Sequence, residues 1–130
     1  MAPGDRDAKG VGTALSEAPL SEEYHPFTRR VISVLRSVPP GRVTCYRDVA
    51  AMAGNPQGAR QVSRIIHSLS RKLGLPWHRV VNAEGVIAIR EPEGRELQQD
   101  LLEAEGVEFR KPGQTDWQEF RWRGENRFGK

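Results

Sequence analysis

The stretch from residue 44 to residue 73 constrains the fold most, because it holds two amphipathic helical patterns with only a tight turn between them. The first pattern, YRDVAAMA, has Thr44 as a candidate N-cap and is closed by Gly54. The second pattern, PQGARQVSRIIHSLSRKL, has Asn55 as its candidate N-cap and Pro56 at its first position, where proline is favoured. Its apolar residues recur at helical spacing, and its other faces are polar and basic. Two helices joined in this way predict a helix-turn-helix.

Two further helices and a hairpin are expected around this pair. The segment HPFTRRVISVLRSV, residues 25–38, has one apolar face and ends at a Pro-Pro-Gly turn. The segment GRELQQDLLEAEG, residues 94–106, predicts the last helix, and the leucines expected to face inward are Leu97, Leu101 and Leu102. RVVNAEGVIAI predicts a small β-hairpin around residues 83–85, whereas the aromatic and basic C-terminal stretch is expected to be irregular. The predicted fold is mainly α, a winged helix-turn-helix with a small β-hairpin.

The chain of 130 residues is long enough for one domain. Residues 1–23 are rich in Gly, Ala, Ser and Pro and lack the apolar core of a secretory signal, so we expect a flexible N-terminal tail before a single domain at residues 24–130. No apolar run approaches the roughly 20 residues of a membrane helix. We therefore expect no membrane partner and a location in the bacterial cytoplasm with the nucleoid or, in a eukaryote, in the nucleus. Nothing in the sequence indicates a dimer, so we expect a monomer.

Cysteine and histidine usage excludes two kinds of site. Cys45 is the single cysteine, so the chain has no internal disulfide. The three histidines are scattered along the sequence and give no zinc-binding spacing with it. We expect no metal site and no cofactor, and Cys45 itself is expected to be a small buried residue.

Basic residues are concentrated in one part of the chain. Residues 29–79 hold ten basic residues and one acidic residue, a net charge of +9, although the whole chain carries only +3. A solvated surface with arginine-rich helices is the simpler explanation. A charge of this size within one folded segment exceeds what solubility requires, however, and it indicates a polyanionic partner such as nucleic acid.

The loop GLPWHRVV, residues 74–81, has the composition of an active-site loop, but Trp77 stands where a nucleophile would be expected. Together, VPPGRVTCYRDVAAMAGNPQGARQVSRIIHSL, then LPWHRVVNAEGVIA, then LLEAEG resemble the DNA-binding domain of O6-alkylguanine-DNA alkyltransferases. The resemblance covers roughly residues 24–123. Those enzymes have a Pro-Cys-His-Arg loop whose cysteine takes the alkyl group from damaged guanine. A tryptophan in place of that cysteine is the mark of the alkyltransferase-like proteins.

The resemblance implies how the helix-turn-helix contacts DNA. Tyr46 matches the tyrosine that rotates the 3′ phosphate of the target nucleotide, and Arg60 matches the arginine that enters the base stack and fills the space of the flipped base. The recognition helix would lie in the minor groove, and the other residues assigned to this contact are Pro56, Gln57, Gly58, Ala59, Gln61, Ser63 and Arg64. From the residues alone, Arg60 could instead contact a phosphate, and Tyr46 could belong to the core.

The same resemblance implies a pocket for the damaged base. Trp77 lines it, and Arg90 stands where the transferases have a tyrosine and would probe the O6 region of guanine by its charge. The residues assigned to the lesion pocket are Tyr46, Pro76, Trp77, Val80, Asn82 and Arg90. An indole offers a wide apolar face to an alkyl group, although a core position for Trp77 is the alternative. His78 and Glu105 match the pair that activates the transferase cysteine, and without a thiol they are expected to be structural.

The predicted function is that of a non-enzymatic DNA damage sensor, which binds O6-alkylguanine in duplex DNA and flips the lesion into a pocket. The resemblance implies that the sensor passes the lesion to nucleotide excision repair. Two alternatives stay open. One is an enzyme of the same fold that removes the alkyl group through another nucleophile, for which Cys45 is the only thiol. The other is a winged-helix regulator that recognises a DNA sequence.

Overall fold

The computed structural model describes residues 24–124, so the predicted tail at 1–23 and the last residues, 125–130, lie outside the described part of the chain. Five α-helices lie within this range: α2 Pro26–Ser37, α3 Tyr46–Met52, α4 Ala59–Leu73, α5 Pro92–Ala104 and α6 Trp117–Phe120. The remaining elements are short: the 3-10 turn η1 Trp77–Arg79 and the strands β1 Thr44–Cys45, β2 Val80–Val81, β3 Phe109–Lys111 and β4 Gln114–Thr115.

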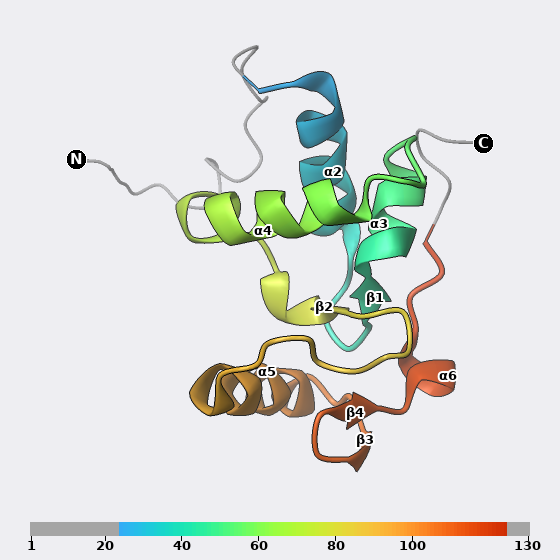
Figure 1. The fold of residues 1–130 in the computed structure, drawn as a ribbon. Coiled ribbons are helices and arrows are strands. Elements are labelled where there is room, and N and C mark those ends of the chain that lie inside the picture. The colour runs from blue at the N-terminus through green and yellow to red at the C-terminus, as the bar shows by residue number, and fades with distance from the viewer. Residues whose placement is uncertain (1–23, 125–130) are drawn as a thin grey trace.

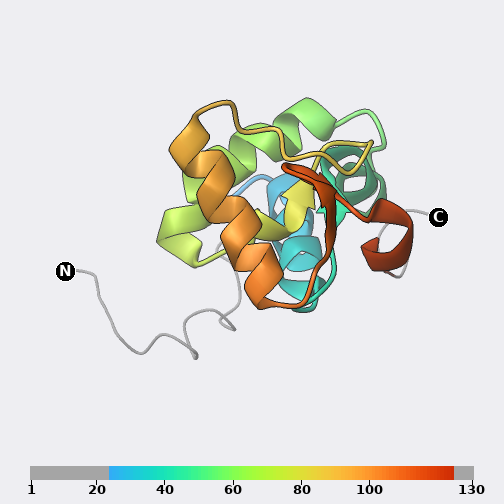
Figure 2. The same ribbon diagram turned by 90° about the horizontal axis from the view of Figure 1, so that it is seen from below.

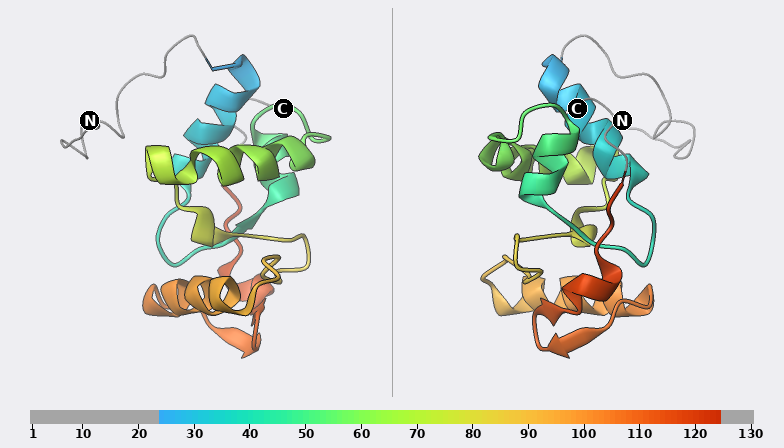
Figure 3. Two further views of the ribbon diagram at one scale, coloured as in Figure 1. Left: turned by 60° about the vertical axis from the view of Figure 1, so that its left-hand side comes forward. Right: turned by 90° about the vertical axis from the view of Figure 1, so that its right-hand side faces the viewer.

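The helices form two groups with the β1–β2 sheet between them (Figure 1). α2, α3 and α4 pack together on one side, while α5, α6 and the β3–β4 pair lie on the other (Figure 3). β1 and β2 are parallel, with Thr44 opposite Val80 and Cys45 opposite Val81. Successive side chains of a strand point to opposite faces, so Val80 belongs to the core of the first group and Val81 to the core of the second.

Two hydrophobic cores hold these groups together. The first core receives one whole face of α2, as its amphipathic pattern predicts, through Phe27, Val31, Ile32, Val34 and Leu35. From α3 and α4 it receives the buried side chains of Val49, Ala50, Met52 and Val62. The second core consists of Val43, Val81, Ile87, Leu102 and Val107. The sheet therefore joins two separately packed halves into one domain.

The helix-turn-helix is present as α3 and α4, but the predicted start of α4 is wrong. The helix begins at Ala59, because Asn55 closes the preceding turn instead of capping the helix. The Asn55 carbonyl accepts a hydrogen bond from Gly58 N at 2.9 Å, and its side chain accepts one from Gln57 N at 3.2 Å. A Cβ at Gly58 would lie 2.8 Å from Cζ of Phe27, so this turn is packed tightly against α2. Glycine, which has no side chain, thus fits the close approach of this turn to α2.

The small strands also differ from the prediction. Thr44 lies in β1 and does not cap α3, which begins directly after Cys45. The turn around residues 83–85 exists, and Oδ1 of Asn82 accepts hydrogen bonds within it, but β2 pairs in parallel with β1 and the chain after the turn is not a strand. The hairpin of the fold is the antiparallel β3–β4 pair, where no strand was expected. Strands of two or three residues are too short to leave a periodic signal.

The C-terminal part of the fold corrects three further expectations. α5 begins at Pro92, two residues earlier than predicted, and its inward face is centred on Gln98 and Leu102. Leu97 was expected to face inward but is 51% exposed. The C-terminal stretch contains the short helix α6, whose aromatic residues pack on the second core, while Trp122 packs on the first. No helix within residues 24–124 has the length and hydropathy needed to span a membrane.

Candidate nucleic-acid interface

The exposed face of α4 is basic. Arg60 and Arg64 are exposed on its first half and Arg71 on its last turn, and the helix contains no acidic residue. The other exposed residues of the predicted contact set are Pro56, Gln57, Gln61 and Ser63. Gly58 and Ala59 belong to the same set, but Gly58 is buried and Ala59 is half-buried, so the turn presents its first two residues rather than all of them. A helix with a long cationic face suits a polyanion.

A cavity of about 780 Å³ lies beside this face. Its walls come from the start of α3, from α4, from the η1 loop and β2, from the segment that leads to α5, and from α5 itself. The lining residues are Tyr46, Ser63, Ile66, His67, Ser70, Arg71, Gly74, Leu75, Trp77, Val80, Ala88, Ile89 and Gln98. Figure 2 shows that the chain between β2 and α5 runs alongside α4. Ala88 and Ile89 of this segment line the cavity. The half-buried Trp77 is therefore a wall of a cavity rather than a fully buried core residue.

The structure brings together half of the predicted pocket. Tyr46, Trp77 and Val80 line the cavity. The other three assigned residues, Pro76, Asn82 and Arg90, are not among its lining residues. The side chain of Asn82 is hydrogen-bonded within its own turn, and Arg90 is exposed immediately after the cavity residue Ile89.

The sequence did not reveal the wall that α4 contributes. Ser63, His67 and Ser70, together with Ile66 and Arg71, recur at intervals of three and four residues, which places them on one side of the helix. The spacing of these residues can be seen in the sequence, but the segment that packs opposite them cannot. Only the fold shows that the loop after α4 turns back and places Trp77 opposite this stripe.

Burial keeps two titratable groups near the cavity in their neutral forms. Burial raises the pKa of the Tyr46 hydroxyl, so this group is a neutral hydrogen-bond donor and acceptor on the cavity wall. Burial also raises the pKa of the Cys45 thiol, which is 2% exposed and does not line the cavity. The expectation that Cys45 is a buried residue is confirmed, and a thiol with a raised pKa is a poor nucleophile.

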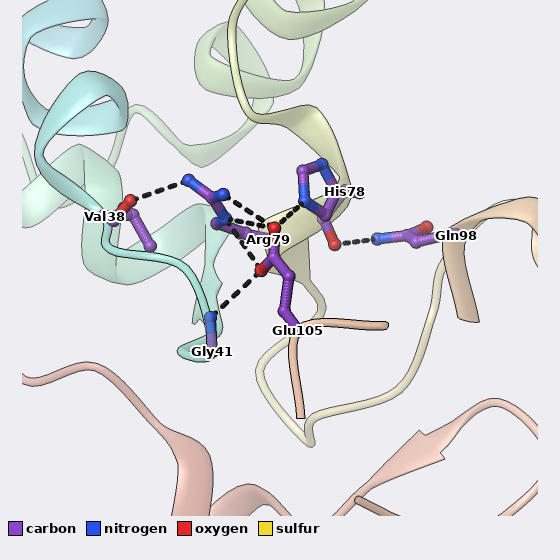
Figure 4. A network of polar contacts seen from close by, with 6 residues as sticks. All are labelled: Val38, Gly41, His78, Arg79, Gln98 and Glu105. Carbon is purple, nitrogen blue, oxygen red and sulfur yellow. Dashed lines mark hydrogen bonds and ion pairs between the residues drawn. The ribbon is translucent and has the colours of Figure 1, made fainter. Parts of the chain in front are cut away.

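Below the η1 loop, Glu105 joins three segments of the chain (Figure 4). Its Oε2 lies 2.8 Å from Nε2 of His78 and 2.7 Å from Nη2 of Arg79. Its Oε1 accepts from Gly41 N at 3.0 Å and from Nε of Arg79 at 3.0 Å, while Nη1 of Arg79 donates to the Val38 carbonyl at 3.0 Å. We refer to Glu105, His78 and Arg79 as the carboxylate network. It ties the Pro-Pro-Gly turn and the end of α5 to the loop that carries Trp77.

The hydrogen bonds to Glu105 set the charge of its carboxyl group. Burial alone would raise the pKa of Glu105, but the bonds from Arg79, His78 and the Gly41 amide outweigh it and lower the pKa to about 2. The carboxylate is therefore ionised at neutral pH. The predicted proximity of His78 and Glu105 is confirmed, and the bonds of Arg79 to Glu105 were not predicted.

Comparison with known proteins identifies the family. Residues 26–107 match the model of the "6-O-methylguanine DNA methyltransferase, DNA binding domain". The chain is 44% identical over 101 residues to the DNA base-flipping protein of Escherichia coli, covering 78% of each chain. It is 38% identical over 84 residues to alkyltransferase-like protein 1 of Schizosaccharomyces pombe, covering 64% of this chain and 78% of the relative. The chain belongs to the alkyltransferase-like family.

Solved structures of this alkyltransferase-like fold support the same assignment. The crystal structure of S. pombe Atl1 in complex with damaged DNA containing O6-carboxymethylguanine has a TM-score of 0.67 and 33% identity to this chain, covering 75% of this chain and 95% of the other. A second structure, S. pombe ATL in complex with DNA, has a TM-score of 0.65. The expected mainly helical fold of the alkyltransferase type is thereby confirmed.

Proposed function

We propose that this alkyltransferase-like protein is a DNA damage sensor: it binds O6-alkylguanine in duplex DNA, rotates the lesion out of the base stack into the cavity beside α4, and leaves the alkyl group in place. The observation that carries this proposal concerns Trp77. Its side chain lines the cavity, and the next residue in the sequence is His78 of the carboxylate network. The relatives named as base-flipping and alkyltransferase-like proteins, and the Atl1 complex with damaged DNA, support it.

DNA would meet the basic face of α4. Arg60 and Arg64 are exposed there, and neutralising backbone phosphates releases counterions, which gives affinity for any duplex. Flipping a nucleotide costs a few kcal/mol of unstacking. The planar guanidinium of Arg60, on the first turn of α4, can replace part of the lost stacking. Tyr46 would guide the phosphate of the flipped nucleotide from the cavity wall.

The cavity suits an alkylated purine. Its volume of about 780 Å³ falls within the range of sites that enclose whole small molecules. Apolar side chains such as Ile66, Leu75 and Ile89 line it together with the Trp77 indole, so an alkyl group entering it is removed from water. Polar groups from Ser63 and His67 lie on the same walls and can orient the base.

Absence of catalysis is part of the proposal. The single thiol, Cys45, is buried outside the cavity wall and has a raised pKa, which disfavours dealkylation through this residue. A sensor without turnover needs a downstream step, and we propose transfer of the marked lesion to nucleotide excision repair. We further propose that the protein acts as a monomer in the compartment that holds the DNA.

The decisive experiment compares matched duplexes that contain either guanine or O6-alkylguanines of increasing size at one position. We expect tighter binding to every lesion than to guanine, and an unchanged protein mass after incubation. Equal affinity for guanine and lesion in a random sequence would favour the sequence-reading regulator. A stable mass increase of one alkyl group on the protein would favour the enzyme, and peptide mapping would name the residue.

A further inference from the structure

A glutamine is buried where α5 meets the loop of Trp77. Gln98 is 2% exposed and lies on the inward face of α5 beside Leu102. Its Nε2 donates to the His78 carbonyl at 2.9 Å and to the Val80 carbonyl at 3.0 Å. Figure 4 shows the first of these bonds, which reaches the backbone of the η1 loop from the side opposite to Arg79. A polar side chain in this position is costly unless such bonds are made.

The two bonds fix the orientation of the amide. Nε2 of Gln98 carries two hydrogens, and each has a backbone carbonyl as its acceptor. The reversed amide would place its oxygen against two carbonyl oxygens, which repel it. The accepting carbonyls belong to residues on either side of Arg79, so one side chain fixes the backbone at both ends of the stretch directly after Trp77.

We propose that Gln98 is a positioning residue that holds the Trp77 indole in the orientation that receives the flipped base. This inference rests on the proposed function. The indole packs edge-on against the His78 ring, with ring centres 6.1 Å apart and planes at 82°. Glu105 binds the His78 ring, and Gln98 binds the backbone carbonyl of His78. The ring against which Trp77 packs is therefore fixed from two directions. A wall ordered before binding costs less entropy when the base arrives.

Gln99 provides a matched control on the same helix. Its Oε1 accepts from Gly113 N at 2.8 Å, and its Nε2 donates to Glu103, so it braces the turn of the β3–β4 hairpin instead of the η1 loop. Gln99→Met and Gln98→Met therefore remove the same chemical group from adjacent positions, with one side chain–backbone hydrogen bond at Gln99 and two at Gln98. Only Gln98→Met removes contacts to the loop of Trp77. Because Gln98 also lines the cavity, the readout that reports on positioning is the Trp77 resonance in the protein without DNA.

The first measurement uses the full chain without DNA. The chain contains three tryptophans, so labelling with 5-fluorotryptophan gives one fluorine NMR resonance for each. The resonance that disappears in Trp77→Phe is that of Trp77. We expect Gln98→Met to shift or broaden this resonance and Gln99→Met to leave it unchanged. In the unsubstituted protein, the side-chain amide hydrogens of Gln98 should exchange with solvent far more slowly than those of the exposed Gln57, which tests the two bonds even if Gln98→Met does not fold.

The second measurement is the ratio of affinities for O6-methylguanine duplex and undamaged duplex. Loss of two hydrogen bonds that order the loop should reduce this ratio by about tenfold in Gln98→Met, with no change in Gln99→Met. An unaltered ratio, an unaltered Trp77 resonance, or rapid exchange of the Gln98 amide in the unsubstituted protein would overturn the inference. If the unsubstituted protein shows no preference for the lesion, the proposed function itself fails, and the resonance then reports only on loop structure.

Discussion

His78 Nε2 lies 2.8 Å from Glu105 Oε2, although the residue before the histidine is a tryptophan and not a thiol. The pair thus has the geometry of an activating relay with nothing to activate. Glu105 also accepts three hydrogen bonds from Arg79 and one from the Gly41 amide, so most of its contacts are to groups that cannot act as the acid or base of a relay at neutral pH. These contacts assign the pair a mechanical role, which is to anchor the loop that carries Trp77.

The first prediction concerns stability at acid pH. Because the pKa of Glu105 is lowered from 4.5 to about 2, its stabilisation is complete above pH 4.5 and is lost as the pH falls towards 2. The side chain is 18% exposed, and the shift corresponds to about 3 kcal/mol at most. Glu105→Gln should therefore lower the free energy of unfolding at pH 7 and make much less difference near pH 2. Denaturant titrations across this pH range measure both values.

Glu96→Gln is the control for this experiment, since Glu96 is an exposed carboxylate on the same helix. We expect a small effect from it that does not depend on pH in this way. A pH dependence of unfolding that is the same in Glu105→Gln as in the unsubstituted protein would contradict the anchoring role.

Amphipathic periodicity predicted the helices well because each long helix buries one continuous face. It fails on α5, where the apolar period predicts a buried Leu97 and the structure buries Gln98 instead. The backbone carbonyls of the η1 loop need a donor at that point, and a leucine cannot supply one. Hydrophobicity alone cannot predict a position whose occupant is chosen for its hydrogen bonds.

The candidate site was predicted in part for a similar reason. Trp77 and Tyr46 could be named because they lie in recognisable motifs, whereas Ile89 and Ser70 became cavity residues only through folding. The parallel pairing of β1 and β2 joins segments about 35 residues apart, and no local signal marks it. This pairing places the loop of Trp77 beneath α4 and so creates the cavity.

The second prediction concerns salt. The charge of +9 within residues 29–79 should give affinity even for undamaged duplex. If about four phosphates are neutralised, the affinity should fall by about two orders of magnitude between roughly 50 and 200 mM salt. Fluorescence anisotropy with one labelled duplex at several salt concentrations measures the slope. A flat dependence would mean that α4 does not face the DNA backbone.

The third prediction separates Arg60 from the other cations of α4. Only the flipped complex has a gap for Arg60 to fill, so Arg60→Ala should weaken binding to lesion duplex by about tenfold more than binding to undamaged duplex. Arg64→Ala is the control, because Arg64 is also exposed on the same helix and should weaken both complexes to a similar extent. Equal losses for the two duplexes in Arg60→Ala would reduce Arg60 to a phosphate contact.

The fourth prediction tests Arg90, which is exposed and is not among the lining residues of the cavity. It follows the cavity residue Ile89, so a modest movement of this loop would bring its guanidinium to the acceptor edge of a bound purine. Arg90→Ala should then reduce discrimination among O6-methylguanine, 2-aminopurine and guanine while preserving affinity for undamaged duplex. Arg110→Ala, which removes an exposed arginine on β3, should leave the discrimination intact. Unaltered relative affinities in Arg90→Ala would remove the residue from the site.

The last prediction asks whether a thiol is all that separates this protein from a transferase. Trp77→Cys places sulfur directly before His78, with Glu105 still bonded to the imidazole. We nevertheless expect little or no methyl transfer.

The substitution removes the indole that forms one wall of a cavity of about 780 Å³, so the alkyl carbon would not be held at the roughly 3–3.5 Å that displacement requires. Transfer of a labelled methyl group from O6-methylguanine duplex measures the outcome, with Trp77→Ser as a control that has the same void and no new thiol. Rapid stoichiometric labelling of Trp77→Cys alone would show that the cavity is still built for displacement chemistry and that tryptophan serves only to block it.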